Sequence, residues 1–484
     1  MLQGSSTAPS PAGYSTHSAP APDSATMNRP VEWACAAALA VALLLVPALW
    51  NGFPLLEYDT GGYIARWYDA ELVESRSTTF GLFLAATHAF DFWPALLVQA
   101  ILTVWLITLT LRALDLGGSP WRLLAIVTGL AIATTLPWLT TILLTDVFAG
   151  LSVLALFLLI CRADVLTRWE KGRLFILIAF SASSHSATFA VLLALLAAAF
   201  LFHFWLRQAL PWRRIFGGAV AVAVGAGLLL ATNFALSHKL AWTPGGYSLP
   251  FARTLQDGIV TRYLKDHCPQ EPLKLCPYRD KLPATADEFL WDSPIFDDLG
   301  RFAGLDDEMR GIFLNSIIAY PWQHLTTALR ATLTQLSLVG TGYGVNNALW
   351  HTYGVIKDHL PEMLPALKAA RQQRGTLGPE TFASINQLHR PIALLCLIAT
   401  VFLLGRGLWQ RNCDSLTLLA ATVLIAVLAN AFVCSVVSGP HDRYGARLAW
   451  LPVLVAVIAV LRARKKKAAL PADRVADVGR RALF

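Results

Sequence analysis

Two carboxylates stand at the end of the first long apolar stretch of the chain. Glu57 and Asp59 belong to the sequence EYDTGGYIARW, residues 57–67. A carboxylate at the mouth of a membrane span is costly unless it is used or solvated. It can act as a general base toward an acceptor hydroxyl, or hold a divalent cation through its oxygens. The alternative is a solvated loop acid that caps a helix beginning near Thr60.

Two further polar groups interrupt apolar stretches. Asp146 follows Thr145 at the start of an apolar run. Its carboxylate would either cap a helix or face the same aqueous surface as Asp59. His185 lies within the serine-rich sequence SASSHSATFA. Polar backbone of this kind is tolerated at membrane depth only where it is buried in protein or lines a cavity. A lone histidine there is either a satisfied polar residue or a functional one.

The fourth polar group is the segment SGPHDRYGARLAW, residues 438–450, which gathers His441, Asp442, Arg443 and Arg447. If this segment is extracytoplasmic, its arginines run against the usual charge bias of membrane proteins. A guanidinium fork matches the oxygens of a phosphate, so we expect at least one of the two arginines to bind phosphate, with His441 as a further candidate. The alternative is an ion pair between Asp442 and an arginine that fixes the loop.

The composition sets the class of protein in which these groups must work. The chain has 484 residues, of which 55% are hydrophobic and 14% charged, and its mean hydropathy is +0.52. Soluble domains carry about 25% charged residues. The sequence therefore predicts an all-α, polytopic integral membrane protein. The net charge of +8 comes from basic residues in short loops and in the tail. This is the positive-inside pattern and excludes nucleic acid as a partner.

Apolar runs predict about ten transmembrane helices, since each span needs roughly 20 apolar residues. The expected spans are 31–50, 93–112, 121–138, 144–161, 173–184, 186–206, 214–236, 390–406, 415–437 and 446–462. Basic clusters before and after the run 173–206 indicate that it crosses twice, with His185 near the outer end. The same rule places both termini in the cytoplasm.

The spans divide the chain into five parts. Residues 1–28 are predicted to be a disordered cytoplasmic tail, in which Met1 and Met27 are alternative starts. An N-terminal transmembrane module, 29–236, includes the first outer loop, 51–92. An extracytoplasmic segment of mixed short helices and loops, 237–389, follows. A C-terminal transmembrane module covers 390–462, and a basic cytoplasmic tail covers 463–484.

Within these parts, three shorter segments carry expectations of their own. The apolar sequence 78–90 is too short for a span and predicts an interfacial or half-inserted helix. The amphipathic sequence 324–338 is expected on the membrane surface. Residues 340–347 are predicted to form a flexible glycine-rich loop, which we do not interpret as a phosphate-binding loop. No G-x-S-x-G, Walker or H-E-x-x-H motif occurs in the chain.

The seven cysteines fall into two groups. Five lie in or beside apolar runs, where a thiol usually acts as a small hydrophobe. Cys268 and Cys276 share a polar loop. If this loop is outside the cytoplasm, they are expected to form a disulfide. The alternatives are two free thiols, or a metal pair that lacks partners.

The pattern resembles the GT-C superfamily of membrane glycosyltransferases, particularly the bacterial relatives of protein mannosyltransferases and of lipid A aminoarabinose transferases. The resemblance is carried by Glu57 and Asp59 after the first span, the sequence SRSTTFGLFL (75–84), Thr145-Asp146 and Arg443-Tyr444. It covers roughly the first half of the chain and the last motif. Serine and threonine at 77 and 78 stand where prolines would be expected, and His185 stands where some relatives carry a lysine.

This resemblance implies a GT-C-like fold and a sugar donor linked to polyprenyl phosphate. Transfer would take place on the outer face of the bacterial inner membrane, to a glycan, lipid or protein acceptor. Asp59 would be the base or, with Glu57, the anchor of a divalent cation, and Asp146 would orient the acceptor or ion. Arg443, Arg447 and His185 would hold the phosphate. The competing hypotheses are a lipid or glycan transporter and a non-catalytic envelope assembly protein.

Overall fold

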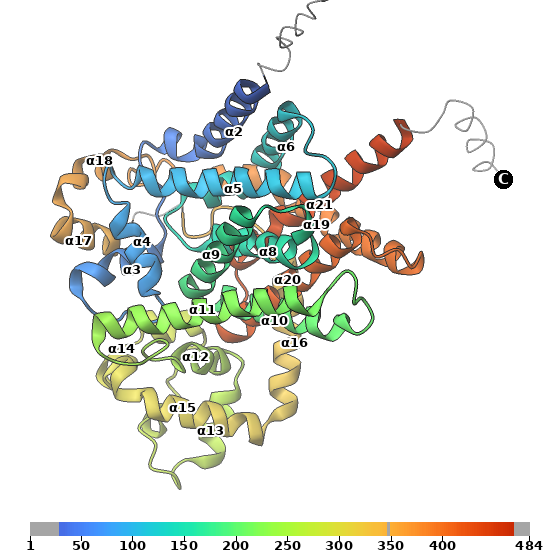
Figure 1. Ribbon diagram of the computed structural model, residues 1–484. Helices are drawn as coiled ribbons and strands as arrows, with labels where there is room; N and C mark the ends of the chain where they lie inside the picture. The colour runs from blue at the N-terminus through green and yellow to red at the C-terminus, as the bar shows by residue number, and fades with distance from the viewer. Residues whose placement is uncertain (1–28, 346–348, 469–484) are drawn as a thin grey trace, which may run out of the picture.

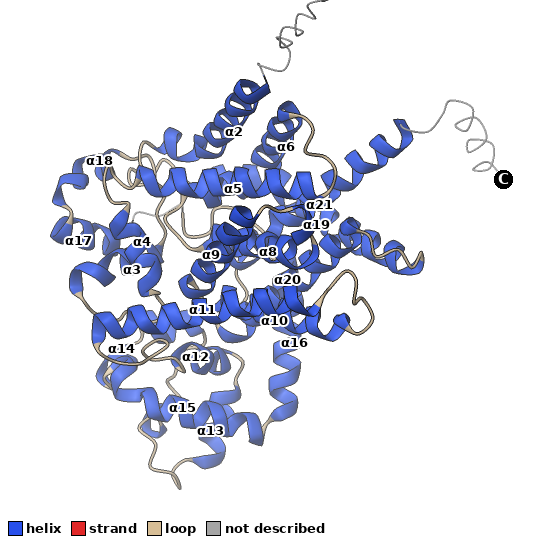
Figure 2. Cartoon of the chain, viewed as in Figure 1, coloured by secondary structure: helices blue, strands red, loops and turns tan. Residues whose placement is uncertain are grey.

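The computed structural model describes residues 29–345 and 349–468. Within these ranges the chain is helical and contains no β-strand (Figure 2), which confirms the all-α prediction for them. Three predicted regions lie wholly or partly outside the described residues. These are the tail 1–28, residues 346–347 of the glycine-rich loop, and residues 469–484 of the C-terminal tail. The start of that tail, 463–468, continues the last helix.

Seven of the described helices are long and apolar enough to cross a membrane. They are α2 (Arg29–Asn51), α5 (Trp93–Ala113), α10 (Ser186–His203), α11 (Trp212–Ser237), α19 (Pro379–Trp409), α20 (Ser415–Val437) and α21 (Asp442–Ala468). Each coincides with one of the ten predicted spans. Their number and composition are compatible with a polytopic membrane protein.

The other three predicted spans coincide with shorter helices, α6 (Pro120–Ala133), α8 (Asp146–Cys161) and α9 (Arg168–Ser184). The span predicted at 121–138 is interrupted, because Thr134 adopts an extended conformation and Pro137 lies in the first turn of α7 (Leu136–Thr141). Helices α9 and α10 meet at His185, which is also extended. The chain therefore breaks where the prediction of two crossings placed the break.

Helix α8 lies at the centre of the bundle (Figure 1) and is buried along nearly its whole length. It packs against α5, α9, α11, α20 and α21. Its contact with α21 is close, because a Cβ atom on Gly150 would lie 2.8 Å from the indole of Trp450. Only glycine permits this approach, which brings together the first turns of α8 and α21.

The first predicted outer loop contains two helices, α3 (Tyr58–Asp69) and α4 (Thr78–Ala86). Helix α4 is packed against α3, α9 and α11, and Phe80 is fully buried. The Thr78 hydroxyl donates to the Asn233 side-chain oxygen of α11 at 2.6 Å. One side of α4 thus packs against the bundle, whereas Leu82 and, after the helix, Phe90 are exposed at 44% and 84%. The expectation of an interfacial or half-inserted helix at 78–90 stays a prediction.

The segment predicted as one extracytoplasmic unit, 237–389, divides into two parts. Helices α12 (Ser248–Gln256), α13 (Ile259–His267), α14 (Pro294–Asp298) and α15 (Arg301–Ala319) surround their own apolar core. The short turns η2 (Cys276–Tyr278) and η3 (Glu288–Asp292) connect them. These helices form the lower part of the molecule in Figure 1, and we call residues 248–319 the small domain.

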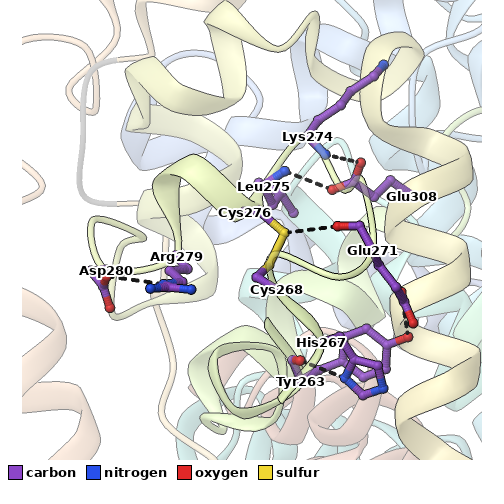
Figure 3. The surroundings of a disulfide bond; sticks show 10 residues. All are labelled: Tyr263, His267, Cys268, Glu271, Lys274, Leu275, Cys276, Arg279, Asp280 and Glu308. Carbon is purple, nitrogen blue, oxygen red and sulfur yellow. Dashed lines mark hydrogen bonds and ion pairs between the residues drawn. A yellow bond between two sulfur atoms is a disulfide. The ribbon is translucent and has the colours of Figure 1, made fainter. Parts of the chain in front are cut away.

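The predicted disulfide is present in the small domain (Figure 3). Cys268 and Cys276 are bonded across a loop that separates them by 8 residues. Glu308 of α15 holds the same loop, because its carboxylate accepts hydrogen bonds from the backbone N–H groups of Lys274 at 2.7 Å and Leu275 at 2.9 Å. The alternatives of free thiols or a metal pair therefore do not apply.

The rest of segment 237–389 returns to the bundle. Helix α16 (Pro321–Ser337) contains nearly all of the sequence 324–338, which was expected on the membrane surface. It packs along α20 and α21. Helix α17 (Trp350–His359) packs against α3, and η4 (Pro361–Met363) and α18 (Leu364–Ala369) follow it. The amide of Gln372 then donates to the carbonyls of Leu56 and Val345, both at 2.6 Å. This part belongs structurally with the first outer loop.

The loops predicted to be cytoplasmic meet at one end of the bundle, on the right in Figure 1. Contacts between them include Arg112–Glu170 at 2.6 Å, Arg214–Asp164 at 3.4 Å, Arg462–Asp414 at 3.2 Å, and a hydrogen bond of 2.8 Å from Lys465 to the Asp115 carbonyl. The turn η1 (Ala163–Val165) lies in the same region. The basic clusters that define the predicted topology thus share one face of the molecule.

Candidate functional site

A short backbone pairing brings the first carboxylates to the start of α8. Leu55 donates to the Thr141 carbonyl at 2.9 Å, and Leu143 donates to the Leu55 carbonyl at 3.0 Å. The Thr60 hydroxyl adds a hydrogen bond of 3.3 Å to the Leu143 carbonyl. These bonds fix the beginning of α3 against the segment that leads into Asp146.

Glu57 is the N-cap of α3. Its carboxylate accepts from the backbone N–H of Asp59 at 2.9 Å, and the Thr60 hydroxyl accepts from the Glu57 N–H at 3.0 Å. The capping interpretation is therefore correct for Glu57, although the side chain is buried and not solvated. An acceptor at this position satisfies backbone donors that have no partner within the helix.

Arg443, in the first turn of α21, contacts all three predicted carboxylates. Its Nη1 lies 3.0 Å from Glu57 Oε1 and 2.7 Å from Asp59 Oδ2. Its Nε donates to Asp146 Oδ2 at 3.0 Å. Glu57 and Asp146 are each 3% exposed and Arg443 is 13% exposed. One guanidinium thus joins three predicted groups that come from distant parts of the sequence.

Asp59 has a second cationic partner. Arg76, from the turn before α4, forms an ion pair with Asp59 Oδ1, while Arg443 holds Oδ2. The Asp59 side chain is 19% exposed, and it is the most exposed of the three carboxylates. We call Glu57, Asp59, Arg76, Asp146 and Arg443 the ion cluster.

Arg447 lies deeper than Arg443 and is completely buried. Its Nε donates to the Asn430 side-chain oxygen of α20 at 2.7 Å, and its Nη1 lies 3.3 Å from His185 Nδ1. Nη1 is also 3.8 Å from Asp146 Oδ1. Because Arg447 donates to His185, the imidazole acts there as an acceptor. Arg447 thus supports the ion cluster from the interior and is itself closed to a ligand, whereas His185 is partly exposed.

The remaining predicted residues of the last motif face another direction. The His441 ring contacts the rings of Tyr343 and Tyr444, with centroids 5.2 and 5.6 Å away. Asp442 accepts from the Gly340 N–H at 2.7 Å and pairs with Arg390 at 2.7 Å. The alternative of an Asp442–arginine pair that fixes a loop is therefore correct, but the arginine is Arg390 of α19.

The two acids at the start of α3 have opposite pKa shifts. Burial raises the pKa of Glu57 from 4.5 to about 7, against the opposing charge of Arg443. Burial also acts to raise the pKa of Asp59, but the charges of Arg76 and Arg443 outweigh it and lower this pKa to about 2. Asp59 is thus held as an anion, whereas Glu57 titrates near neutral pH.

The predicted divalent-cation site at Glu57 and Asp59 does not fit this arrangement. The guanidinium of Arg443 lies between the carboxylates and bonds to the oxygens that would coordinate the ion. Among the residues that the structure describes, no group of three or more histidine, cysteine, aspartate or glutamate side chains is placed to hold a metal. We therefore assign the ion cluster no metal chemistry.

A cavity of about 670 Å³ adjoins the ion cluster. This size is in the range of small-molecule sites. Its lining combines aromatic rings, amides and an ion pair, from Tyr58, Tyr343, Phe382, Asn386, Gln387, Arg390 and Asp442. Tyr58 is the neighbour of Glu57 in sequence, and Asp442 is the neighbour of Arg443. The five residues of the ion cluster do not themselves line the cavity, which meets the cluster through these sequence neighbours and through Gly344.

The glycine-rich loop forms one wall of this cavity and is held in place. Thr341 and Asn386 exchange two hydrogen bonds, of 2.7 and 3.0 Å. Gly344 has φ of +75°, and a Cβ atom there would lie 2.7 Å from the Glu57 side chain. Its described residues, 340–345, therefore do not form a free loop. The loop brings backbone directly against a buried acid.

No protein-family model matches this chain, and no curated protein matches it. The site must therefore be interpreted from its own residues. Two residues of the site, Arg76 and Asn430, were not among the site residues predicted from the sequence. Arg76 carries the same signal as Arg443, because both are basic residues on the predicted outer side. Asn430 is a polar residue within a predicted span, where such residues usually face protein partners.

Proposed function

We propose that this chain is a membrane glycosyltransferase that moves a sugar from a polyprenyl-phosphate donor to a hydroxyl of a glycan, lipid or protein acceptor. The observation that carries the proposal is the ion cluster. Three carboxylates converge on Arg443 at one end of an apolar helical bundle, beside a cavity of about 670 Å³. Acid and base groups, an anion-binding guanidinium and a lipid-facing bundle are the parts that this reaction needs.

Arg443 is the proposed phosphate-binding residue. It is less buried than Arg447, and its guanidinium presents the fork that phosphate oxygens match. A phosphate bound there would compete with the carboxylates for the guanidinium N–H groups. Charge that develops on the leaving phosphate would then be stabilised by a donor already in place.

Asp59 is the proposed general base. Its side chain is 19% exposed, whereas those of Glu57 and Asp146 are each 3% exposed. Both oxygens of each acid are engaged, those of Asp59 by Arg76 and Arg443 and those of Glu57 by the helix cap and Arg443. Glu57 has the pKa closer to neutrality, but its side chain is only 3% exposed. Geometry decides before pKa. When phosphate draws Arg443 away from Asp59, a charge that lowers its pKa is withdrawn and its basicity rises.

The chemical step is a single displacement. Asp59 accepts the proton of the acceptor hydroxyl, and the acceptor oxygen forms a bond to the anomeric carbon of the sugar. The bond between that carbon and the phosphate oxygen breaks, and polyprenyl phosphate leaves with the electron pair. Asp146 orients Arg443, and the aromatic and amide side chains of the cavity bind the apolar face and the hydroxyls of the sugar-bearing substrate.

The proposed topology has about ten crossings, both termini in the cytoplasm and the ion cluster on the outer face of a bacterial inner membrane. It is supported by the meeting of the basic loops at one end of the bundle. The ion cluster is formed at helix ends that alternate with those loops along the chain. A disulfide in the small domain fits an oxidising compartment.

The test is transfer from polyprenyl-phosphate sugars in proteoliposomes. We expect Asp59→Asn to lower the release of polyprenyl phosphate by about 100-fold or more. The matched control is Asp69→Asn, because Asp69 is at the far end of the same helix and pairs with His359. A wild-type rate in the Asp59→Asn variant would reject the proposal. Movement of the intact donor across the bilayer without cleavage would favour the transporter.

A further inference from the structure

The tip of the α10–α11 hairpin exposes an unusual concentration of aromatic rings. The exposed residues are Phe200, Phe202, Phe204, Trp205, Trp212 and Phe216, and Trp205 is 76% exposed. Four of them are linked through ring contacts and the other two form a pair. The Phe200 ring lies 5.8 Å from both the Phe204 and Trp212 rings. The Phe202 and Trp205 rings lie 6.2 Å apart, and those of Trp212 and Phe216 lie 6.3 Å apart. We call residues 200–216 the aromatic tip.

The aromatic tip also carries unneutralised positive charge. Arg207 and Arg213 are exposed, and neither forms an ion pair with any carboxylate in the described ranges 29–345 and 349–468. The next residue, Arg214, is different, because it pairs with Asp164. Two exposed guanidinium groups therefore belong to the aromatic tip without an acidic partner among the described residues.

The backbone of the tip is held while its rings point outward. Leu210 is buried in the main core, and its carbonyl lies 2.7 Å from His203 Nδ1. The Leu210 N–H donates to the Leu206 carbonyl at 2.8 Å. A turn that is fixed to the core and still exposes six aromatic rings is suited to contact with something outside the chain.

We propose that the aromatic tip anchors the protein to anionic phospholipid headgroups. Two observations select this partner. The tip joins two of the seven helices that can span a membrane, and aromatic residues at the ends of such helices lie at headgroup level. The unpaired guanidinium groups complement phosphate, and anionic leaflets attract basic residues next to a span. The proposal does not depend on sugar transfer.

The experiment uses the full chain in phosphatidylcholine liposomes that contain a photoactivatable phosphatidylglycerol or a photoactivatable phosphatidylcholine. Crosslinked peptides are mapped by mass spectrometry. We expect the phosphatidylglycerol probe to label residues 200–216 about tenfold more than the phosphatidylcholine probe. The double variant Arg207→Gln/Arg213→Gln should lose this preference and retain labelling by both probes at the phosphatidylcholine level.

The control is a basic pair of the small domain, Arg279→Gln/Lys281→Gln, which should leave the preference at the tip unchanged. Arg279 is partly exposed and pairs with Asp280, and Lys281 is exposed. The variant Trp205→Ala/Trp212→Ala should reduce labelling by both probes, because it removes rings and not charge. Equal labelling of the wild-type tip by the two probes would overturn the proposal. So would a preference that survives Arg207→Gln/Arg213→Gln. Absence of labelling by either probe would overturn it as well, because the tip would then not contact lipid headgroups.

Discussion

Arg443 Nε donates to Asp146 Oδ2 at 3.0 Å across a sequence separation of 297 residues. Both residues lie in the first turn of a helix, α21 and α8. A carboxylate is favoured by the helix dipole at this position, whereas a guanidinium is not. Arg443 therefore needs the acids around it, and the acids need a cation because they are buried. Neither group is satisfied without the packing of the two helices.

Removing Arg443 should destabilise the protein. Arg443→Met leaves three carboxylates without their shared cation, two of them 3% exposed. We expect the free energy of unfolding in detergent to fall by about 3 kcal/mol or more. The control is Arg390→Met, since Arg390 is 48% exposed and pairs with Asp442. That variant should lose at most about 1 kcal/mol, and equal losses would contradict the role of burial.

The pH dependence of stability should identify Glu57. Its pKa is raised from 4.5 to about 7 in the folded protein, so the folded state binds this proton more tightly than the unfolded chain. The resulting stability is present below pH 4.5 and is lost as the pH rises through about 7. We expect the Tm of the wild type to fall relative to that of Glu57→Gln between about pH 5 and pH 8.

Other titrations are common to both proteins and cancel in that comparison. Asp59 does not contribute in this window. Its pKa is lowered to about 2, so its stabilising effect is lost only as the pH falls through that value. Parallel Tm curves for the wild type and Glu57→Gln would show that Glu57 does not titrate near neutral pH.

Substitution of Gly344 should disturb the ion cluster through Glu57. In Gly344→Ala, the new methyl group meets the Glu57 side chain at 2.7 Å and the residue must keep a φ of +75°. The conformation alone costs about 1–2 kcal/mol. We expect a lower Tm and a loss of transfer activity. Gly354→Ala is the control, because nothing lies within 4 Å of its Cβ in α17, and alanine there should stabilise the helix by up to about 1 kcal/mol.

The disulfide should stabilise the small domain and protect both of its cysteines. In intact cells, a membrane-impermeant thiol reagent should label Cys268 and Cys276 only after reduction. Closing a loop across 8 residues should contribute about 2.5 kcal/mol by chain entropy. Cys268→Ser should therefore lower stability by about this amount and expose Cys276 to the reagent. Rapid labelling of both wild-type thiols without reductant would contradict this prediction and the topology.

The sequence by itself determined the helical class, the approximate positions of the spans, the break at His185 and the pairing of Cys268 with Cys276. These features depend on local properties, such as the length of an apolar run, a polar interruption within it and the proximity of two thiols in one loop. Positive charge in short loops also indicated which helix ends share a face. This charge is also a local property, because it depends only on the residues of each loop.

Only the tertiary structure decided how the polar residues are partnered. It placed Arg443 among Glu57, Asp59 and Asp146, turned Arg447 inward to Asn430, and added Arg76, which the sequence had not singled out. It also packed one side of α4 against α3, α9 and α11. These outcomes depend on the close approach of α8 and α21 and on the pairing of Leu55 with Ile142. Residues up to 386 apart meet there, and their contacts follow from packing that no local pattern contains.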